Sequence, residues 1–245
     1  MKKMRVDEWL IAHGFCTDRD EALRMILEGR IRHNPDMPVR KASELVEFES
    51  ALLVDTEESF ASRGARNLQP VLERILPDLS GQTAVDVGAS TGGFTDVLLR
   101  GGAKRVYAVD VGRGLLHAKL RNDPRVVCLE GVNARTLDRS LIPEEVDLAV
   151  MDVSFISATK ILPAIDTVLK RGGCALILVK PQFEADRQDV PPGGVVTDPA
   201  VREACVEKVR RFAESRLGWI FLETTPSAIK GPKGNQEYIA VFRKG

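Results

Sequence analysis

From Thr83 onward, short apolar runs alternate with stretches of helical periodicity. The runs are rich in β-branched residues and have the length of buried strands, an alternation typical of βαβ units. The predicted strands are Ala84–Val87, Val106–Val109, Val126–Leu129, Leu148–Met151, Ala175–Val179, Ile220–Glu223 and Tyr238–Phe242. The predicted helices are Asn67–Ile75, Gly93–Arg100, Leu115–Arg121, Ala158–Leu169 and Asp198–Ser215. The pattern therefore predicts an α/β fold, with a doubly wound, Rossmann-like sheet of seven strands that ends in an antiparallel hairpin.

Residues 1–60 follow a different pattern. Apolar positions recur at helical spacing in two stretches, which we expect to end near Gly14 and at Gly29, because glycine commonly terminates helices. Residues 30–34 and a proline-containing turn follow, and then short strand-like pieces at 46–48 and 51–54. We therefore predict a small α+β domain over 1–60, a linker and leading helix over 61–82, and the α/β domain over 83–245.

Composition narrows the class of protein. The 245 residues include 35 basic and 35 acidic side chains, and no apolar run approaches the roughly 20 residues of a membrane span. The N-terminus lacks the apolar stretch of a signal peptide, so we expect a cytoplasmic protein that does not bind membranes. Four cysteines lie far apart without paired spacing, and we predict neither a disulfide nor a metal site.

A glycine-rich segment, Asp86-Val-Gly-Ala-Ser-Thr-Gly-Gly93, joins the first predicted strand of the α/β domain to the next helix. Glycines at such a turn let the backbone approach a ligand that a Cβ would exclude. The following strand ends at Asp110, about 20 residues later, which is the spacing of an acid that binds ribose hydroxyls. We therefore predict a nucleoside site that includes Asp86, Gly88, Ser90, Gly92 and Asp110.

The residues leave three alternatives for this turn: S-adenosylmethionine, a nicotinamide cofactor, or no ligand. The dinucleotide fingerprint has glycine at three positions, and Ser90 interrupts that spacing. A carboxylate at Asp86 would repel a pyrophosphate, whereas it suits a ligand with an amino group and a sulfonium. These features favour S-adenosylmethionine.

Three further side chains fall at strand ends, where the chemistry of a doubly wound sheet collects. Asp152 and Lys180 follow the fourth and fifth predicted strands, and Glu237 precedes the last. A partly desolvated lysine favours the neutral amine, which can remove a proton from a hydroxyl. The alternative is that Asp152 and Lys180 form only a structural ion pair.

Basic residues gather around the second predicted helix and its exit: Arg19, Arg24, Arg30, Arg32, Arg40 and Lys41. A charge run of this kind is commonly a solvated face. The balanced net charge excludes polyanion binding by the whole surface, so a nucleic acid would have to bind at a local patch.

Several strings together resemble the TlyA (hemolysin A) family of FtsJ-like RNA 2′-O-ribose methyltransferases. They are Ser62-Arg-Gly64, Asp86-Val-Gly-Ala-Ser-Thr-Gly-Gly-Phe-Thr-Asp96, Val109-Asp-Val-Gly112, Leu120-Arg-Asn-Asp-Pro-Arg-Val126, Asn133-Ala-Arg135, Asp152-Val-Ser-Phe-Ile-Ser157, Lys180-Pro-Gln-Phe-Glu184 and Gly231-Pro-Lys-Gly-Asn235. The first 60 residues are similar to the RNA-binding domain of ribosomal protein S-four at Arg5-Val-Asp7, Leu10, Gly14, Arg19, Ala22, Ile26 and Gly29.

The resemblance implies a class I methyltransferase fold, S-adenosylmethionine as the cofactor, and cytidines of ribosomal RNA in a ribosomal subunit as the target. It implies that Asn133 and Asp152 also contact the cofactor. RNA contacts are implied for Arg19, Arg24, Arg30, Arg32 and Arg63.

The family uses a Lys-Asp-Lys-Glu tetrad, and three of its members map onto Asp152, Lys180 and Glu237. Asn67 stands at the position of the first lysine. This change favours an alternative, an RNA-binding protein that keeps the cofactor pocket without catalysis, whereas the other three residues favour an active enzyme. A membrane-active toxin, suggested by the hemolysin name, is opposed by the lack of a spanning or basic amphipathic segment.

Overall fold

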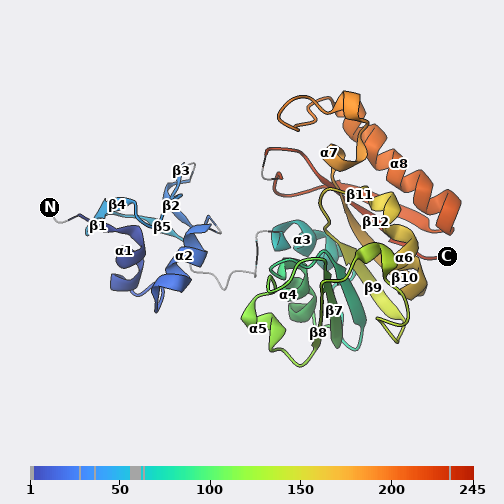
Figure 1. Ribbon diagram of the computed structural model, residues 1–245, viewed down its shortest axis with the longest axis horizontal. Coiled ribbons are helices and arrows are strands. Elements are labelled where there is room, and N and C mark those ends of the chain that lie inside the picture. The colour runs from blue at the N-terminus through green and yellow to red at the C-terminus, as the bar shows by residue number, and fades with distance from the viewer. Residues whose placement is uncertain (1–2, 28, 36, 56–61, 63, 232) are drawn as a thin grey trace. The chain divides into compact units, whose positions relative to one another are not determined.

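The computed structural model describes residues 3–27, 29–35, 37–55, 62, 64–231 and 233–245. The chain divides into two compact units, Met1–Ser62 and Arg63–Gly245, which are coloured along the chain in Figure 1. We describe each unit by itself.

The first unit packs two helices with two small sheets. Helices α1 (Val6–Ala12) and α2 (Arg19–Leu27) are followed by left-handed Gly14 and Gly29, as the pattern predicts. Strands β1 (Lys3–Arg5) and β4 (Leu45–Glu47) pair antiparallel, and β2 (Ile31–Asn34) lies between β3 (Met37–Pro38) and β5 (Leu53–Val54). The pattern did not predict β1, β2 or β3, because pieces of two to four residues carry little readable alternation.

The second unit contains the predicted sheet of seven strands. They are β6 (Thr83–Val87), β7 (Arg105–Asp110), β8 (Val126–Glu130), β9 (Val146–Met151), β10 (Leu169–Val179), β11 (Ile220–Pro226) and β12 (Tyr238–Arg243). Their order is β11-β12-β10-β9-β6-β7-β8. The pairs from β10 to β8 are parallel, whereas β12 is antiparallel to both β10 and β11. This arrangement confirms the Rossmann-like sheet and its final antiparallel hairpin.

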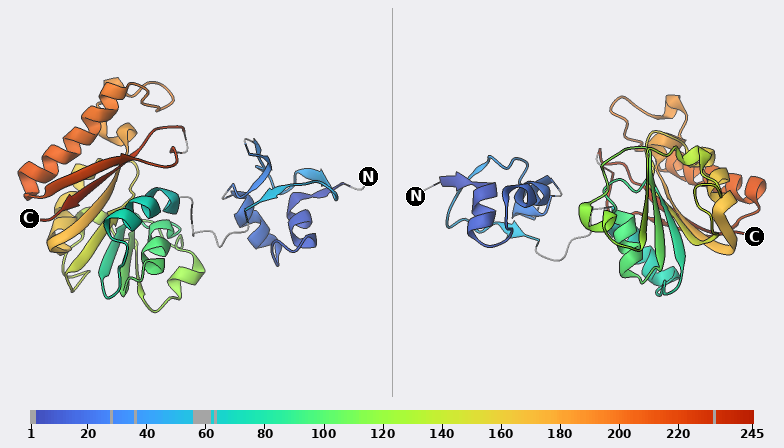
Figure 2. Two further views of the ribbon diagram at one scale, coloured as in Figure 1. Left: turned by 180° about the vertical axis from the view of Figure 1, so that it is seen from behind. Right: turned by 60° about the horizontal axis from the view of Figure 1, so that its bottom comes forward.

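Helices cover both faces of this sheet (Figures 1 and 2). Helices α3 (Ala65–Ile75) and α4 (Gly93–Arg100) pack together, as do α6 (Leu162–Val168) and α8 (Pro199–Leu217). The remaining short helices are α5 (Ala118–Arg121), α7 (Pro181–Glu184), η1 (Ala134–Thr136), η2 (Ala158–Lys160) and η3 (Arg187–Asp189).

Two predicted helices are shorter than expected. The helix predicted from Leu115 begins only at Ala118, because the His117 side chain accepts a hydrogen bond from the Lys119 amide and caps it there. The helix predicted over 158–169 begins with the 3₁₀ turn η2, and its last residue, Leu169, already belongs to strand β10.

The topology decides which side chains can meet. Strand β6 is buried along its length, with β7 on one side and β9 on the other. The chain leaves these neighbouring parallel strands at one edge of the sheet, on either side of the point where the strand order reverses. Ligands of open α/β sheets bind in the crevice at that edge.

In the described part of the chain, no helix is long and apolar enough to span a bilayer. No group of three or more His, Cys, Asp or Glu side chains in these ranges has the arrangement of a metal site.

Candidate functional site

A cavity of about 430 Å³ opens at the carboxyl ends of β6, β7 and β9. Five of the seven residues predicted to bind the cofactor line it: Gly88, Ser90, Asp110, Asn133 and Asp152. The other two, Asp86 and Gly92, are outside its lining. The predicted strand ends therefore come together around one hollow.

Glycine is required at positions 88 and 92 for two different physical reasons. A Cβ on Gly88, at φ +86°, would lie 2.2 Å from the backbone oxygen of Asp152, so only glycine allows the ends of β6 and β9 to approach. A Cβ on Gly92, at φ +99°, would lie 2.2 Å from Leu120 and 2.8 Å from Leu116. Packing between the turn and these leucines therefore accounts for Gly92 without a ligand.

The Asp110 carboxylate is oriented by two backbone amides. Its Oδ2 accepts a hydrogen bond of 2.7 Å from the Ser90 amide, and its Oδ1 accepts one of 2.7 Å from the Gly112 amide. Each carboxylate oxygen can accept more than one hydrogen bond. Because Asp110 also lines the cavity, it can accept further bonds from a ribose there.

Replacing Asp110 with alanine is expected to weaken binding of S-adenosylmethionine by about 1–3 kcal/mol, because donors on the ribose and on the turn lose their acceptor. Isothermal titration calorimetry would measure the change. Asp123→Ala is a matched control, since that carboxylate pairs with Arg125 beyond the cavity lining and its loss should leave the affinity unchanged. Equal affinity of Asp110→Ala and the wild type would contradict the assignment.

Asp86 is fully buried beneath the glycine turn. Its Oδ2 accepts a 2.7 Å hydrogen bond from Thr95, while its Oδ1 has no hydrogen-bond partner among the described residues. Burial raises the pKa of this carboxyl to about 7, and the nearby carboxylates of Asp152 and Asp110 act in the same direction. Asp86 would therefore act on a cavity ligand through its charge and not through surface contact.

Lys180 and Asp152 form an ion pair with an Nζ–Oδ1 distance of 2.5 Å. Lys180 also donates a hydrogen bond of 3.1 Å to the hydroxyl of Ser154, which lines the cavity together with Asp152. The lysine side chain is only 12% exposed. A single amine is thus held beside the cavity by an acid and a hydroxyl from the loop after β9, both of which line the cavity, whereas Lys180 itself is outside its lining.

Glu237 lies near this pair but is more deeply buried. Gln182 Nε2 donates a 2.9 Å hydrogen bond to its Oε1, and a Cβ on Gly231 would come within 2.7 Å of the same oxygen. Burial raises the pKa of Glu237, whereas the hydrogen bond from Gln182 and the charge of Lys180 lower it. Its negative charge is therefore coupled to the lysine of the ion pair.

Asn67 has a partner that sequence reasoning did not foresee. It is buried in α3, and its side-chain oxygen accepts a 3.0 Å hydrogen bond from the backbone amide of Ile229. Ile229 lies between β11 and β12, in the segment that leads to Glu237. Asn67 therefore anchors this segment to α3.

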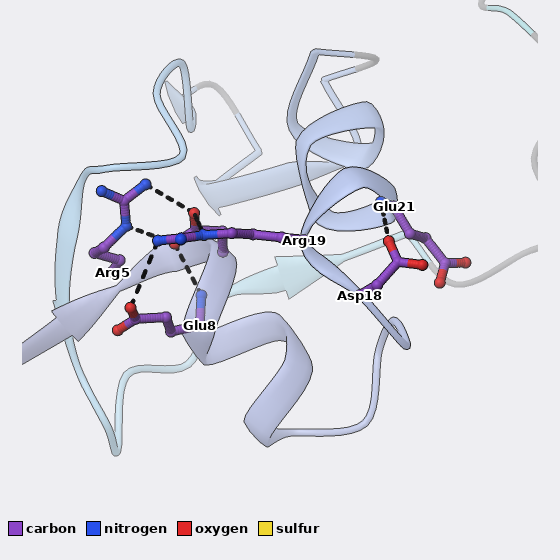
Figure 3. Close-up of polar contacts among 6 residues, drawn as sticks. Arg5, Glu8, Asp18, Arg19 and Glu21 are labelled. Carbon is purple, nitrogen blue, oxygen red and sulfur yellow. Dashed lines mark hydrogen bonds and ion pairs between the residues drawn. The ribbon is translucent and has the colours of Figure 1, made fainter.

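The arginines predicted to bind RNA differ in their surroundings. Figure 3 shows Arg19 from α2 close to Arg5 and Glu8; its Nε contacts the buried Asp7 at 3.0 Å, and its Nη2 lies 3.7 Å from Glu8. Hydrogen bonding to Arg5, and then to Arg19, lowers the pKa of Asp7 to about 2 although burial opposes the shift. Arg19 thus ties α2 to α1.

Arg30 donates a 2.8 Å hydrogen bond to the backbone oxygen of Asp55, and Arg32 donates one of 2.9 Å to that of Pro35. Arg24 is exposed and makes no ion pair with any residue that the structure describes. Arg63 lies outside the described residues. Among the described arginines of the predicted set, Arg24 thus combines an exposed side chain with the absence of an ion pair, which leaves it accessible to a phosphate.

Sequence reasoning also missed a buried acid beside the site. Glu184 accepts hydrogen bonds of 2.6 Å from Ser157 Oγ and 2.5 Å from the Ala158 amide. These bonds attach the loop after β9 to α7, just beyond Lys180. Glu184 is part of the family-like segment that begins at Lys180, so it could have been singled out. Nothing in the local sequence, however, distinguishes a buried acid from a solvated one.

Comparison with known proteins places these features in context. The profile of the FtsJ-like methyltransferases matches residues 60–244. The chain is 43% identical to the 16S/23S rRNA (cytidine-2′-O)-methyltransferase TlyA of Mycobacterium tuberculosis, over 99% of this chain and 90% of the relative. It is 39% identical to hemolysin A of Brachyspira hyodysenteriae, over 98% and 99% of the two chains. A solved structure described as a hemolysin from Streptococcus thermophilus superposes with a TM-score of 0.76 at 36% identity, covering all of this chain and 89% of the other.

Proposed function

The chain belongs to the FtsJ-like methyltransferase family, and from this premise we propose that it methylates the ribose 2′-hydroxyl of cytidines in ribosomal RNA. The enzyme class, an S-adenosylmethionine-dependent RNA 2′-O-methyltransferase, follows from the family and from its curated relatives. The observation that carries the proposal is the Asp152–Lys180 pair, in which Asp152 lines the cavity together with Asp110, the candidate ribose-binding acid.

The residues of the cavity fit S-adenosylmethionine. Gly88 lets the ends of β6 and β9 approach each other at the cavity, and Asp110 presents an oriented carboxylate to a ribose. Asp86 adds a buried carboxyl below the turn, outside the cavity lining, whose Oδ1 has no hydrogen-bond partner among the described residues and whose negative charge would favour a cationic ligand. Asn133 lines the same cavity and is available to the adenine edge, although its Oδ1 already caps η1.

Lys180 is the candidate base of the reaction. When bound, S-adenosylmethionine supplies an electrophilic methyl group on sulfur. Lys180 would accept the proton of the 2′-hydroxyl as its oxygen attacks, with Asp152 holding the amine and Glu237 contributing negative charge. Placing the hydroxyl in line with the methyl group supplies much of the rate enhancement in such displacements, up to about 7–11 kcal/mol.

The first unit is the proposed RNA-binding domain, and a ribosomal subunit is the proposed partner. The exposed basic residues of this unit would bind phosphates of the RNA backbone, and such contacts do not depend on the base sequence. A cytoplasmic location, where a ribosomal RNA substrate would be met, is part of this proposal.

The proposed function is tested by transfer of tritiated methyl groups from S-adenosylmethionine to isolated ribosomal subunits and to protein-free ribosomal RNA. Mapping the labelled ribose identifies the nucleotide. Label on the base, on protein, or on no ribosomal substrate would reject the proposal, and the last result would support an RNA-binding protein without catalysis.

Two arginines of α2 give a matched test of RNA docking. Arg24→Ala should weaken RNA binding and reduce the slope of log affinity against log salt by about one, because one phosphate contact is lost. Arg19→Ala should in addition lower the free energy of unfolding, by up to about 1 kcal/mol, because Arg19 pairs with buried Asp7.

Filter binding across a salt series and urea unfolding measure the two effects. An unchanged salt slope for Arg24→Ala would assign that arginine to an ordinary solvated face.

A further inference from the structure

The loop after β9 holds the end of Lys180 at two points. Asp152 Oδ1 lies 2.5 Å from Nζ, and the Ser154 hydroxyl accepts a hydrogen bond from Nζ at 3.1 Å. The family resemblance assigns a role to Asp152 but none to Ser154. Ser154 nevertheless lines the cavity, beside the place where the reacting groups would meet.

These two contacts limit how the amine can be oriented. A neutral lysine amine has one bond to Cε, two N–H bonds and one lone pair, in a tetrahedral arrangement. The N–H that bonds to Ser154 leaves two positions for the lone pair. Asp152 Oδ1 forms an ion pair with Nζ without hydrogen-bond geometry, and its negative charge disfavours the lone pair on its own side, so the lone pair occupies the other position.

We propose that Ser154 is a positioning residue, whose hydroxyl fixes the rotation of the Lys180 amine so that its lone pair faces the target 2′-hydroxyl. This inference rests on the proposed function. In the step concerned, the hydroxyl proton passes to Lys180 Nζ and the oxygen forms the bond to the methyl carbon. The carbon–sulfur bond breaks and leaves its electron pair on sulfur.

The surroundings of Asn67 make this restraint more important in this chain than in relatives with a full tetrad. Asn67 carries no charge, and its amide oxygen is engaged by Ile229. Orientation of the reacting ribose therefore depends on Lys180 alone among the tetrad lysines. Any freedom of its amine would lower the fraction of bound complexes that can react.

The kinetic test compares Ser154→Ala, Ser154→Thr and Ser157→Ala in the full-length protein, under single-turnover conditions on the RNA that the wild type methylates. Ser154→Ala should lower the rate of methyl transfer about 10- to 100-fold, with dissociation constants for RNA and S-adenosylmethionine within about twofold of the wild type. Ser154→Thr keeps the hydroxyl and should recover most of the rate. Ser157 bonds to Glu184 and not to Lys180, so Ser157→Ala should lower the melting temperature more than Ser154→Ala does and the rate less.

A crystal structure of Ser154→Ala without cofactor or RNA gives a readout independent of activity. Lys180 Nζ is expected to leave its position and occupy more than one rotamer, whereas Ser154→Thr should retain the wild-type position. The proposal fails if Ser154→Ala reacts as fast as the wild type, if only binding is weakened, or if Nζ does not move.

A wild-type protein that methylates no RNA would instead reject the proposed function. The crystal structure would then still decide whether Ser154 holds the lysine.

Discussion

Lys180→Ala is expected to reduce methyl transfer by about 100- to 10,000-fold, the contribution typical of a positioned general base. The reason is the position of its amine, 2.5 Å from Asp152, which lines the cavity. Initial rates with tritiated S-adenosylmethionine on one RNA substrate would measure the loss, and calorimetry would establish that the variant still binds the cofactor.

Lys170 provides a matched control on the same strand. Lys170 lies near the start of β10, whereas Lys180 directly follows the end of that strand. Lys170 pairs with Asp147 on β9, at the opposite edge of the sheet. Lys170→Ala removes a lysine and an ion pair of the same kind, so methyl transfer should stay within about twofold of the wild type. Turnover that survives Lys180→Ala would falsify the proposed mechanism.

Asn67→Lys belongs to the same experiment. If Lys180 is the principal base, restoring the missing lysine should leave the rate per folded enzyme unchanged or raise it. The structure adds an expected cost, because the hydrogen bond to the Ile229 amide is lost within a buried site, which destabilises by about 1–3 kcal/mol. Asn67→Ala separates the two effects, since it loses the bond without adding a charge.

Asp86→Asn is expected to change how stability depends on pH. In the unfolded chain the pKa of this carboxyl is near 3.8, whereas burial raises it to about 7 in the folded protein. Between these values the folded protein binds the proton and the unfolded chain does not. The stabilisation due to Asp86 is therefore complete below pH 3.8 and is lost as the pH rises through 7, a difference of about 4 kcal/mol.

Asparagine keeps the acceptor for Thr95 but cannot ionise. The free energy of unfolding of Asp86→Asn, minus that of the wild type, should therefore increase by about 4 kcal/mol between pH 4 and pH 8. Urea unfolding at a series of pH values would measure it. Thr95→Val should move the upper end of the window to higher pH, because the Thr95 hydrogen bond lowers this pKa. A difference that stays flat across the window would refute the assignment.

In the folded protein without ligand, the buried carboxyl of Asp86 thus favours its neutral form, and a bound cation would favour the ionised form. Ionised Asp86 is costly in the folded protein, and a bound sulfonium or amino group would offset that cost. Binding of S-adenosylmethionine should therefore be weaker in Asp86→Asn at pH 8 even though the variant is more stable. Stability and ligand affinity would then change in opposite directions through one side chain.

Much of the fold was predictable from the local pattern. The β-branched runs that form β6, β7, β9, β10 and β12 are largely buried, and burial on both faces produces continuous apolar runs, whereas the edge strands β8 and β11 are only partly buried. The convergence of Asp110, Asp152 and Lys180 was predictable for a similar reason, because parallel strands deliver their carboxyl ends to one edge of the sheet. The family strings then assigned chemistry to those ends.

Tertiary structure alone decided how these side chains are used. Asn67 bonds to Ile229, 162 residues away, and Arg19 is held by Asp7 although both could have faced solvent. Asp86 proved to be buried beneath the turn. Such partners depend on which element packs on which, so no local periodicity encodes them. The sequence by itself determined where chemistry could gather, whereas packing decided which side chains hold one another and which remain available to a ligand.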